Sequence, residues 1–158
     1  QALRIAREEG VLTIFNPAPA RADLPAEAYS LSDVFCPNES ETEILTGLPV
    51  KDLHGAEAAA GALLARGTRA VVLTLGERGS LLATAGRTLH VEAPRVQALD
   101  TTGAGDAFVG SLAFFLARGL ELEQCVRRAV RIASVSVQAS GTQSSFPRAA
   151  DLPVELLA

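Results

Sequence analysis

The residues best suited to chemistry form the segment Asp100-Thr101-Thr102-Gly103-Ala104-Gly105-Asp106. It precedes residues 107–116, whose apolar spacing predicts a helix that is buried on most of its surface. Gly103 and Gly105 should therefore lie at a helix N-terminus, where unpaired N–H groups and the helix dipole favour an anion. Neither glycine has a Cβ, so a phosphate could approach the main chain closely. Asp106 would then accept the proton of a hydroxyl that attacks this phosphate, which indicates phosphoryl transfer.

A purely structural interpretation of this segment remains open. An aspartate near a helix start is often only an N-cap or a first-turn residue that satisfies unpaired N–H groups, and the segment alone favours neither interpretation. The segment also differs from the better-known phosphate motifs. No Gly-Lys-Ser/Thr follows it, and Phe108 stands where a dinucleotide-binding fingerprint has glycine.

Composition places the chain among ordinary globular proteins and excludes some partners. It has 158 residues, of which 48% are hydrophobic and 20% charged, so we expect a single domain over residues 1–158 with its own core. The net charge of -4 gives no electrostatic footprint for nucleic acid or an anionic membrane. No apolar run reaches the length of roughly 18 residues that a membrane span needs. We therefore expect neither nucleic acid nor membrane as a partner.

Cysteine and methionine usage adds two expectations. Cys36 and Cys125 lie in apolar stretches without further metal ligands, which indicates reduced core thiols in a cytosolic protein. The chain contains no methionine, and residues 1–10 have the pattern of a helix end that a glycine terminates. We therefore expect this chain to be the C-terminal part of a longer protein.

Strand and helix patterns alternate along the chain. The expected strands are residues 11–15, 34–36 and 70–75, then an antiparallel pair at 80–84 and 88–91, and an alternating run at 91–99. The expected helices are residues 38–47, 56–66, 107–116 and 122–138. This order predicts an α/β domain with a largely parallel sheet, in which ligands bind at the carboxyl ends of strands. The loops after Cys36, Leu75 and Leu99 lie at such ends.

Five segments together resemble the ribokinase branch of the carbohydrate kinase family, which also includes fructokinases and adenosine kinases. They are Asn16-Pro17-Ala18-Pro19-Ala20, Pro37-Asn38-Glu39-Ser40-Glu41, Thr74-Leu75-Gly76-Glu77-Arg78-Gly79, Asp100 to Asp106, and Gly141-Thr142-Gln143-Ser144-Ser145. The resemblance extends from Val11 to the tail and corresponds to the C-terminal half of such an enzyme. It implies a ribokinase-like three-layer α/β/α fold with a mostly parallel sheet, from which the N-terminal half and its β-sheet lid are missing.

The resemblance also implies roles for individual residues. Asp106 matches the catalytic base that contacts the sugar's primary hydroxyl, and Gly103, Ala104 and Gly105 match the anion hole. Asn38 matches a contact to the nucleotide phosphates, and Glu41 an acid that positions Mg²⁺ through its water shell. The nucleotide would be lined by Thr74, Leu75, Gly76, Glu77, Arg78, Gly79, Gly105 and Asp106. Val130 stands where many relatives have a polar side chain near the adenine.

A potassium site is the last feature that the resemblance implies. Its K⁺ ligands would be Asp100, Thr102, Ser136, Ala139, Gly141 and Ser145. One carboxylate with several carbonyl oxygens suits a monovalent cation, whose charge would help to order the loop. Taken alone, Asn38 with Glu41, the glycines at 76 and 79, and the serines at 144 and 145 also fit an ordinary capped helix, a turn and a solvated loop.

The implied activity is ATP-dependent phosphorylation of D-ribose to D-ribose 5-phosphate. The resemblance implies a cytoplasmic enzyme, with the nucleus as an alternative location, whose full-length form is a homodimer through the lid. Two other hypotheses stay open. One is a kinase of the same family for fructose, another sugar or a nucleoside, since the sugar-binding half is absent. The other is a fragment that binds nucleotide or a partner without catalysis.

Overall fold

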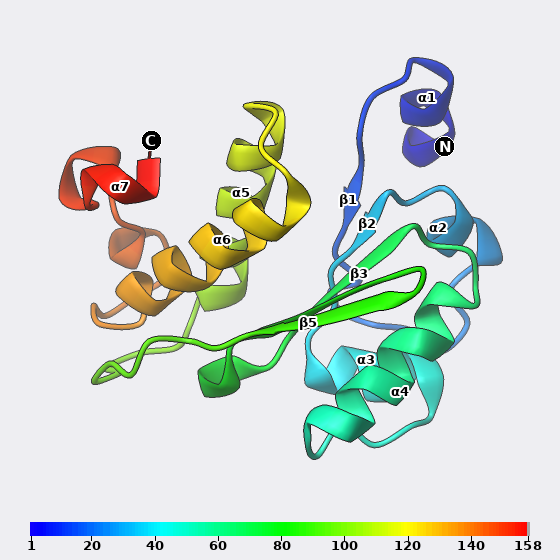
Figure 1. Ribbon diagram of the computed structural model, residues 1–158, viewed down its shortest axis with the longest axis horizontal. Helices are drawn as coiled ribbons and strands as arrows, with labels where there is room; N and C mark the ends of the chain where they lie inside the picture. The colour runs from blue at the N-terminus through cyan, green and yellow to red at the C-terminus, as the bar shows by residue number, and fades with distance from the viewer. Residues whose placement is uncertain (158) are drawn as a thin grey trace. The chain divides into compact units, whose positions relative to one another are not determined.

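The computed structural model describes residues 1–157, and the chain forms two compact units. The first comprises residues 1–76 and 80–90, and the second comprises residues 77–79 and the chain from Val91 onward (Figure 1). The single domain expected over residues 1–158 stays a prediction. No helix among residues 1–157 combines the length and the apolar character that crossing a membrane requires.

The first unit is built on a five-stranded sheet. Its strands are β1 (Ile14–Phe15), β2 (Val34–Phe35), β3 (Ala70–Thr74), β4 (Ser80–Thr84) and β5 (Arg87–Val91), and their order in the sheet is the same as in the sequence. β1, β2 and β3 run parallel, with Phe35 opposite both Phe15 and Val71. β4 runs antiparallel to β3. The predicted α/β fold with a mixed, mostly parallel sheet is confirmed.

An apolar core joins this sheet to its helices. The helices of the first unit are α1 (Ala2–Glu8), α2 (Ala26–Ser30), α3 (Glu39–Thr46) and α4 (Leu53–Leu64). Leu63 of α4 and Leu45 of α3 are buried in one cluster with Leu73 of β3. The ring of Tyr29 from α2 stacks on Phe35, with the ring centroids 5.0 Å apart. Burial of these side chains is the main free-energy gain that holds the helices on the sheet.

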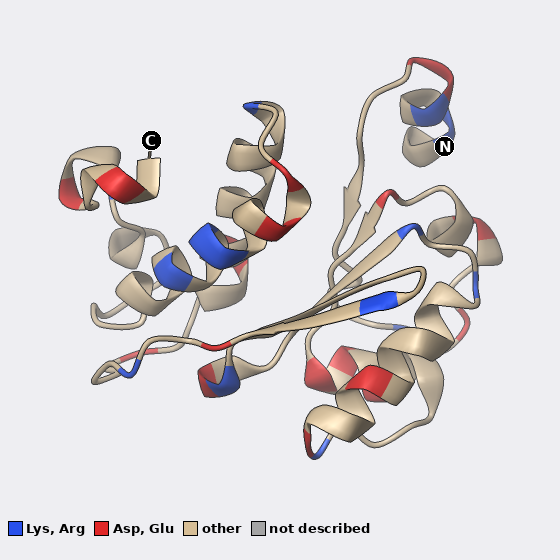
Figure 2. Cartoon of the chain, viewed as in Figure 1, with Lys and Arg blue, Asp and Glu red and all other residues tan. Residues whose placement is uncertain are grey.

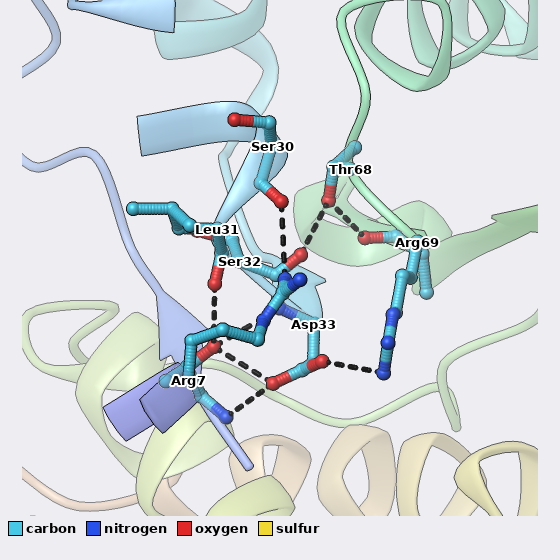
Figure 3. Close-up of polar contacts among 9 residues, drawn as sticks. Arg7, Ser30, Leu31, Ser32, Asp33, Thr68 and Arg69 are labelled. Carbon is cyan, nitrogen blue, oxygen red and sulfur yellow. Dashed lines mark hydrogen bonds and ion pairs between the residues drawn. The ribbon is translucent and has the colours of Figure 1, made fainter. Parts of the chain in front are cut away.

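Polar residues that directly precede the parallel strands meet at the amino edge of the sheet. Figure 3 shows the Asp33 carboxylate facing Arg69, whose Nη1 donates a hydrogen bond to it at 2.9 Å. The same carboxylate accepts hydrogen bonds from the main-chain N–H of Thr13 at 2.9 Å and from its hydroxyl at 3.0 Å. Because Thr13, Asp33 and Arg69 each stand one residue before a strand, these bonds fix the register of β1, β2 and β3.

The second unit is mainly helical. It contains α5 (Ala104–Ala117), α6 (Leu122–Ser136), α7 (Val154–Leu157) and the short 3-10 helices η2 (Gln143–Ser145) and η3 (Ala149–Asp151), while η1 (Gly76–Arg78) spans the boundary between the units. Phe115 of α5 and Val126 of α6 are fully buried. Arg128 of α6 lies 5.1 Å from the centroid of the Phe115 ring and donates to the Leu156 carbonyl at 3.1 Å. This arginine therefore ties α7 to α5 and α6.

Two of the predicted strands are wrong in extent. Residues 92–99 form no strand, although they alternate in polarity, and Val96 and Leu99 are exposed. Pro94 lacks an N–H, so it cannot donate to a strand ladder. The strand expected at residues 11–15 begins only at Ile14, because the Val11 N–H bonds the Ala6 carbonyl at 2.8 Å and completes the end of α1.

Two of the predicted helices also need correction. α5 begins at Ala104 rather than at residue 107, and it is not buried on most of its surface. Its buried residues, Ala107, Phe108, Leu112 and Phe115, form one face, and Phe114 is 48% exposed. α4 begins at Leu53 rather than at residue 56, because the Asp52 side chain caps it by accepting from the Gly55 N–H at 2.8 Å.

Candidate active site

The turn between β2 and α3 is built around Asn38 and Glu41. The Asn38 Oδ1 accepts from the Glu41 N–H at 2.8 Å, and the Glu41 Oε2 accepts from the Asn38 N–H at 2.8 Å. This reciprocal pair is a capping box, and Gly47 with φ of 72° ends the helix. Both side chains are therefore ordinary caps. Within residues 1–157 the Asn38 Nδ2 and the Glu41 Oε1 make no hydrogen bond, so each residue keeps one atom for a ligand.

Electrostatics at this turn favour a cation. Burial raises the pKa of Glu41, and the N–H of Asn38 offsets part of this effect. Burial and the Glu41 charge raise the pKa of Cys36 to about 12. Acidic residues gather on α3, which carries Glu39, Glu41 and Glu43 (Figure 2). An oxygen-preferring cation near Glu41 would stabilise its charged form, and Mg²⁺ commonly binds through one carboxylate, several waters and phosphate.

The same turn is held from both neighbouring strands. Asn16, the first residue after β1, donates from its Nδ2 to the Cys36 carbonyl at 2.7 Å. On the other side the Thr74 N–H donates to the Pro37 carbonyl at 3.0 Å, and Asn38 pairs with Thr74 in a parallel bridge. The structure thus brings Asn38, Glu41 and Thr74 together at the carboxyl edge of the sheet. Sequence reasoning gave Asn16 no role, although a polar residue directly after a parallel strand was the available signal.

The predicted nucleotide segment, residues 74–79, has mixed surroundings. The Leu75 side chain is 1% exposed and belongs to the apolar core. Gly76 has φ of 55°, and the nearest atom to a Cβ built on it is a Glu39 carboxylate oxygen at 3.9 Å. Gly79 has φ of 91°, and a Cβ there would overlap the Val91 carbonyl oxygen. Glycine is therefore required at position 79 because the main chain of residues 91–93 passes too close for a side chain. The neighbouring Glu77 is exposed and Arg78 half-buried.

Asp106 is free to act on a ligand. It is exposed in the first turn of α5, and its carboxylate makes no hydrogen bond or ion pair within the described chain. The N-cap is Gly103, so the interpretation of Asp106 as an N-cap is wrong, whereas its position in the first turn agrees with the other structural interpretation. The Ala104 N–H bonds the Thr101 carbonyl at 3.2 Å, whereas the N–H groups of Gly105 and Asp106 have no acceptor among residues 1–157. These unpaired groups are suited to an anion.

The two glycines of this turn lie in different surroundings. A Cβ on Gly103 would come within 3.1 Å of the Phe146 Cε1 and 3.3 Å of the Thr142 Cα. A Cβ on Gly105 would meet nothing within 4 Å. Gly103 is therefore packed against its own chain, and only Gly105 leaves its missing side chain as open space for a ligand.

Asp100 organises the loop that precedes α5. Its carboxylate accepts from the N–H groups of Thr102 and Gly141, both at 2.9 Å. The Thr102 side chain, followed by the Gly141 and Thr102 N–H groups, lowers the pKa of Asp100 to about 2. The N–H groups of Leu99 and Asp100 both donate to the Val137 carbonyl, at 2.8 and 3.2 Å. The loop is thereby fastened to the end of α6 and to the segment that starts at Gly141.

The other predicted potassium ligands belong to the same unit. The Ser136 carbonyl accepts from the Ala139 N–H at 3.3 Å, and the Ser145 hydroxyl, which is buried, donates to the Thr142 carbonyl at 2.6 Å. With the Asp100 carboxylate these groups supply only oxygen, as a potassium site requires. No group of three or more His, Cys, Asp and Glu side chains suited to a metal occurs in residues 1–157. Val130, which stands where many relatives have a polar side chain near the adenine, is 4% exposed.

The first unit has polar side chains at the carboxyl edge of its parallel strands, and the second unit has a helix N-terminus with unpaired N–H groups within the described residues. Each feature is typical of α/β proteins that bind phosphate groups. Comparison with known families identifies the particular group. The model of the pfkB family carbohydrate kinases matches residues 1–149, and the chain belongs to this family.

Individual relatives agree with this assignment. The chain is 52% identical to ribokinase of Mus musculus over 160 residues, which cover 99% of this chain and 50% of that protein. It is 41% identical to deoxyribokinase of Salmonella typhi over 146 residues, covering 92% of this chain and 48% of that protein. The structure of Arabidopsis thaliana ribokinase complexed with ribose and ATP superimposes with a TM-score of 0.91 at 30% identity, covering 99% of this chain and 51% of that one. The chain spans about half the length of the curated relatives it matches.

Proposed function

We propose that the chain is the nucleotide-binding part of an ATP-dependent sugar kinase that converts D-ribose to D-ribose 5-phosphate. The observation that carries the proposal is the exposed, unpaired Asp106 carboxylate in the same helical turn as the unpaired N–H groups of Gly105 and Asp106. Membership of the pfkB family supports it, as does the similarity to a ribokinase bound to ribose and ATP.

The proposed reaction assigns one step to each group. Asp106 accepts the proton of the sugar's primary hydroxyl as the oxygen attacks the γ-phosphorus of ATP. The bond between this phosphorus and the bridging oxygen breaks, and ADP leaves with the bond's electron pair. The turn from Gly103 to Gly105 forms the anion hole, where the unpaired N–H groups of Gly105 and of the adjoining Asp106 stabilise the negative charge on the transferring group.

Two cations belong to the proposal. Bound Mg²⁺ would neutralise charge on the ATP phosphates, and Glu41 would orient its water shell while the Asn38 Nδ2 donates to a phosphate oxygen. K⁺ would lie among the oxygen atoms of Asp100, Thr102 and residues 136–145. The capping-box atoms that make no hydrogen bond within residues 1–157 support the Mg²⁺ assignment. The hydrogen bond from the Gly141 N–H to the Asp100 carboxylate supports the K⁺ assignment, because it holds two of the proposed ligand residues together.

The base can be tested by one substitution in the complete kinase. Asp106→Asn should lower kcat by roughly 10²–10⁴-fold, the usual contribution of a general base, while ATP still binds. Glu57→Gln removes an exposed carboxylate of α4, which is distant in sequence from residues 100–106, and is the matched control, expected to leave kcat unchanged. An Asp106→Asn variant that turns over within a factor of a few of the wild type would remove Asp106 from this role.

A second candidate substrate has support of its own. The 41% identity to a deoxyribokinase favours 2-deoxyribose as the alternative to ribose. Phosphorylation assays of the complete kinase with ribose, 2-deoxyribose, fructose and a nucleoside would rank them by kcat/KM. Calorimetry of the 158-residue chain with ATP and Mg²⁺ separates catalysis from binding. Nucleotide binding without ribose phosphorylation would support a non-catalytic fragment, and ribose turnover would exclude it.

A further inference from the structure

We propose that Phe146 is a positioning residue for the anion hole, because its ring fixes the Gly103 turn from which α5 begins. The inference rests on the anion-hole role proposed above for residues 103–105. Phe146 contacts neither sugar nor nucleotide in this proposal. It acts through the main chain of Gly103.

The contact between ring and turn is direct. A Cβ built on Gly103 would lie 3.1 Å from the Phe146 Cε1, which is tighter than ordinary van der Waals contact, and 3.5 Å from its Cζ. The ring edge and the Thr142 main chain therefore occupy the side of Gly103 on which a side chain would project. Gly103 also has φ of 81°, a left-handed conformation that reverses the chain just before the helix.

The segment that carries Phe146 is itself fixed. The Ser145 N–H and hydroxyl both donate to the Thr142 carbonyl, at 3.1 and 2.6 Å, and close the short helix η2. The Phe146 N–H donates to the Gln143 carbonyl at 3.4 Å. At the start of this segment Gly141 donates to Asp100 at 2.9 Å. The ring therefore projects from a hydrogen-bonded base, and Phe146 is half-buried rather than exposed.

The turn is supported differently at its two ends. Its first residue, Asp100, is held by hydrogen bonds to Thr102, Gly141 and Val137. Its last residue, Gly103, has no side chain, and the packed ring and the Thr142 main chain are what restrict it from this side. Removing the ring should free only the Gly103 end. The direction of the N–H groups at residues 104–106 would then become less defined, because these groups follow Gly103 in the chain.

The test uses three variants of the complete kinase. Phe146→Ala removes the ring, and a displacement of roughly 1 Å in a catalytic group can cost up to about 10²-fold, so kcat should fall by about tenfold to a hundredfold. KM for sugar and for ATP should stay within about twofold, since ground-state binding is not affected. Phe146→Leu keeps apolar volume against Gly103 and should recover kcat to within about threefold of the wild type. Phe114→Ala, which removes a half-exposed ring from α5, should match the wild type.

Binding of a transition-state mimic separates positioning from general loosening. ADP with aluminium fluoride and sugar imitates the transferring phosphoryl group, whereas ADP alone does not reach the anion hole. Phe146→Ala should weaken the aluminium fluoride complex by the same factor as kcat and leave the ADP affinity unchanged. If Phe146→Ala does not fold, Phe146→Val replaces it, because the valine side chain is too short to reach Gly103. Its kcat and its affinity for the aluminium fluoride complex must then be lower than those of Phe146→Leu.

The outcomes distinguish this inference from the function on which it rests. Failure of the complete wild-type kinase to phosphorylate any sugar with ATP would overturn the proposed function itself, and near-wild-type turnover of Asp106→Asn would remove only the role of Asp106 as base. Loss of turnover in Asp106→Asn combined with wild-type kcat in folded Phe146→Ala would overturn only the positioning role. Equal weakening of ADP and of the aluminium fluoride complex would also overturn it, because the effect would then be general.

Discussion

At the scale of single residues, a glycine can be required by its dihedral angle, by lack of space or by a ligand's need for room. Gly103 meets the first two conditions, with φ of 81° and the Phe146 ring against it. Gly105 meets neither, since it lies inside α5 and a Cβ built on it would meet nothing within 4 Å. The third condition is the one that the proposed anion hole assigns to Gly105.

Alanine at each glycine should separate these causes. Gly105→Ala should raise the free energy of unfolding by up to about 1 kcal/mol, because alanine is the better helix former, and lower kcat by about tenfold or more as its Cβ enters the phosphate space. Gly103→Ala should instead destabilise the fold by about 1–3 kcal/mol through strain and contact with Phe146. Urea unfolding and steady-state kinetics measure both. A Gly105→Ala variant with full activity would contradict the ligand explanation.

Asp100 should make stability depend on pH in a defined direction. Its folded pKa is lowered from 3.8 to about 2, so the folded state favours the charged form. This contribution is present above about pH 4 and is lost as pH falls towards 2. Asp100→Asn should therefore lower the urea midpoint at pH 7, and the difference from the wild type should narrow by pH 3. The measurement uses potassium-free buffer, with Glu57→Gln as the control. A difference that stays constant between pH 7 and pH 3 would refute this cause.

At the scale of elements, predictability follows from whether the signal is local. Asn38 and Gly47 bound α3 as predicted, because capping and a left-handed end depend on neighbouring residues alone. The Asp52 cap of α4 is a local signal too, and the start predicted at residue 56 overlooks it. Residues 92–99 alternate like a strand, yet a strand needs a partner, and no local pattern specifies one. The contact of Phe146 with Gly103 is likewise long-range and was not predictable.

Substitutions of Asn38 can separate its role as the N-cap of α3 from its proposed contact with the ATP phosphates. Asn38→Ala should lower the free energy of unfolding by about 0.5–2 kcal/mol, the usual cost of losing such a cap. Asn38→Asp should keep stability near the wild type because aspartate caps equally well. It should still raise KM for ATP by about tenfold, since a carboxylate would face phosphate where an amide donated. Thermal unfolding and ATP kinetics decide the matter. Unchanged KM in Asn38→Asp would leave Asn38 as a cap only.

At the scale of the whole molecule, the sequence motifs identified the family but could not supply the geometry of the site. The order of five short segments was enough to indicate a carbohydrate kinase, and the family match over residues 1–149 confirms it. The roles of Asp106, Glu41 and the potassium ligands stay predictions, because each depends on a ligand. The chain covers half of its ribokinase relative, so the sugar and the homodimer stay predictions as well.

The open edge of the sheet should make the isolated chain associate with itself. β1 is the first strand of the sheet and pairs on one side only within the described chain. The residues just before it are apolar and exposed, with Val11 at 58% and Leu12 at 53%. Such an edge can pair with another copy, although a strand of two residues is a weak template, so we expect reversible association at roughly 0.1–1 mM. Sedimentation equilibrium should then give an average mass above 16.4 kDa.

A double variant with Val11→Lys and Leu12→Lys tests this cause. Both residues are exposed, so lysine adds charge beside the edge without disturbing the core, and the variant should sediment as a monomer. A wild-type chain that stays monomeric across the same range would show that the short edge is already protected.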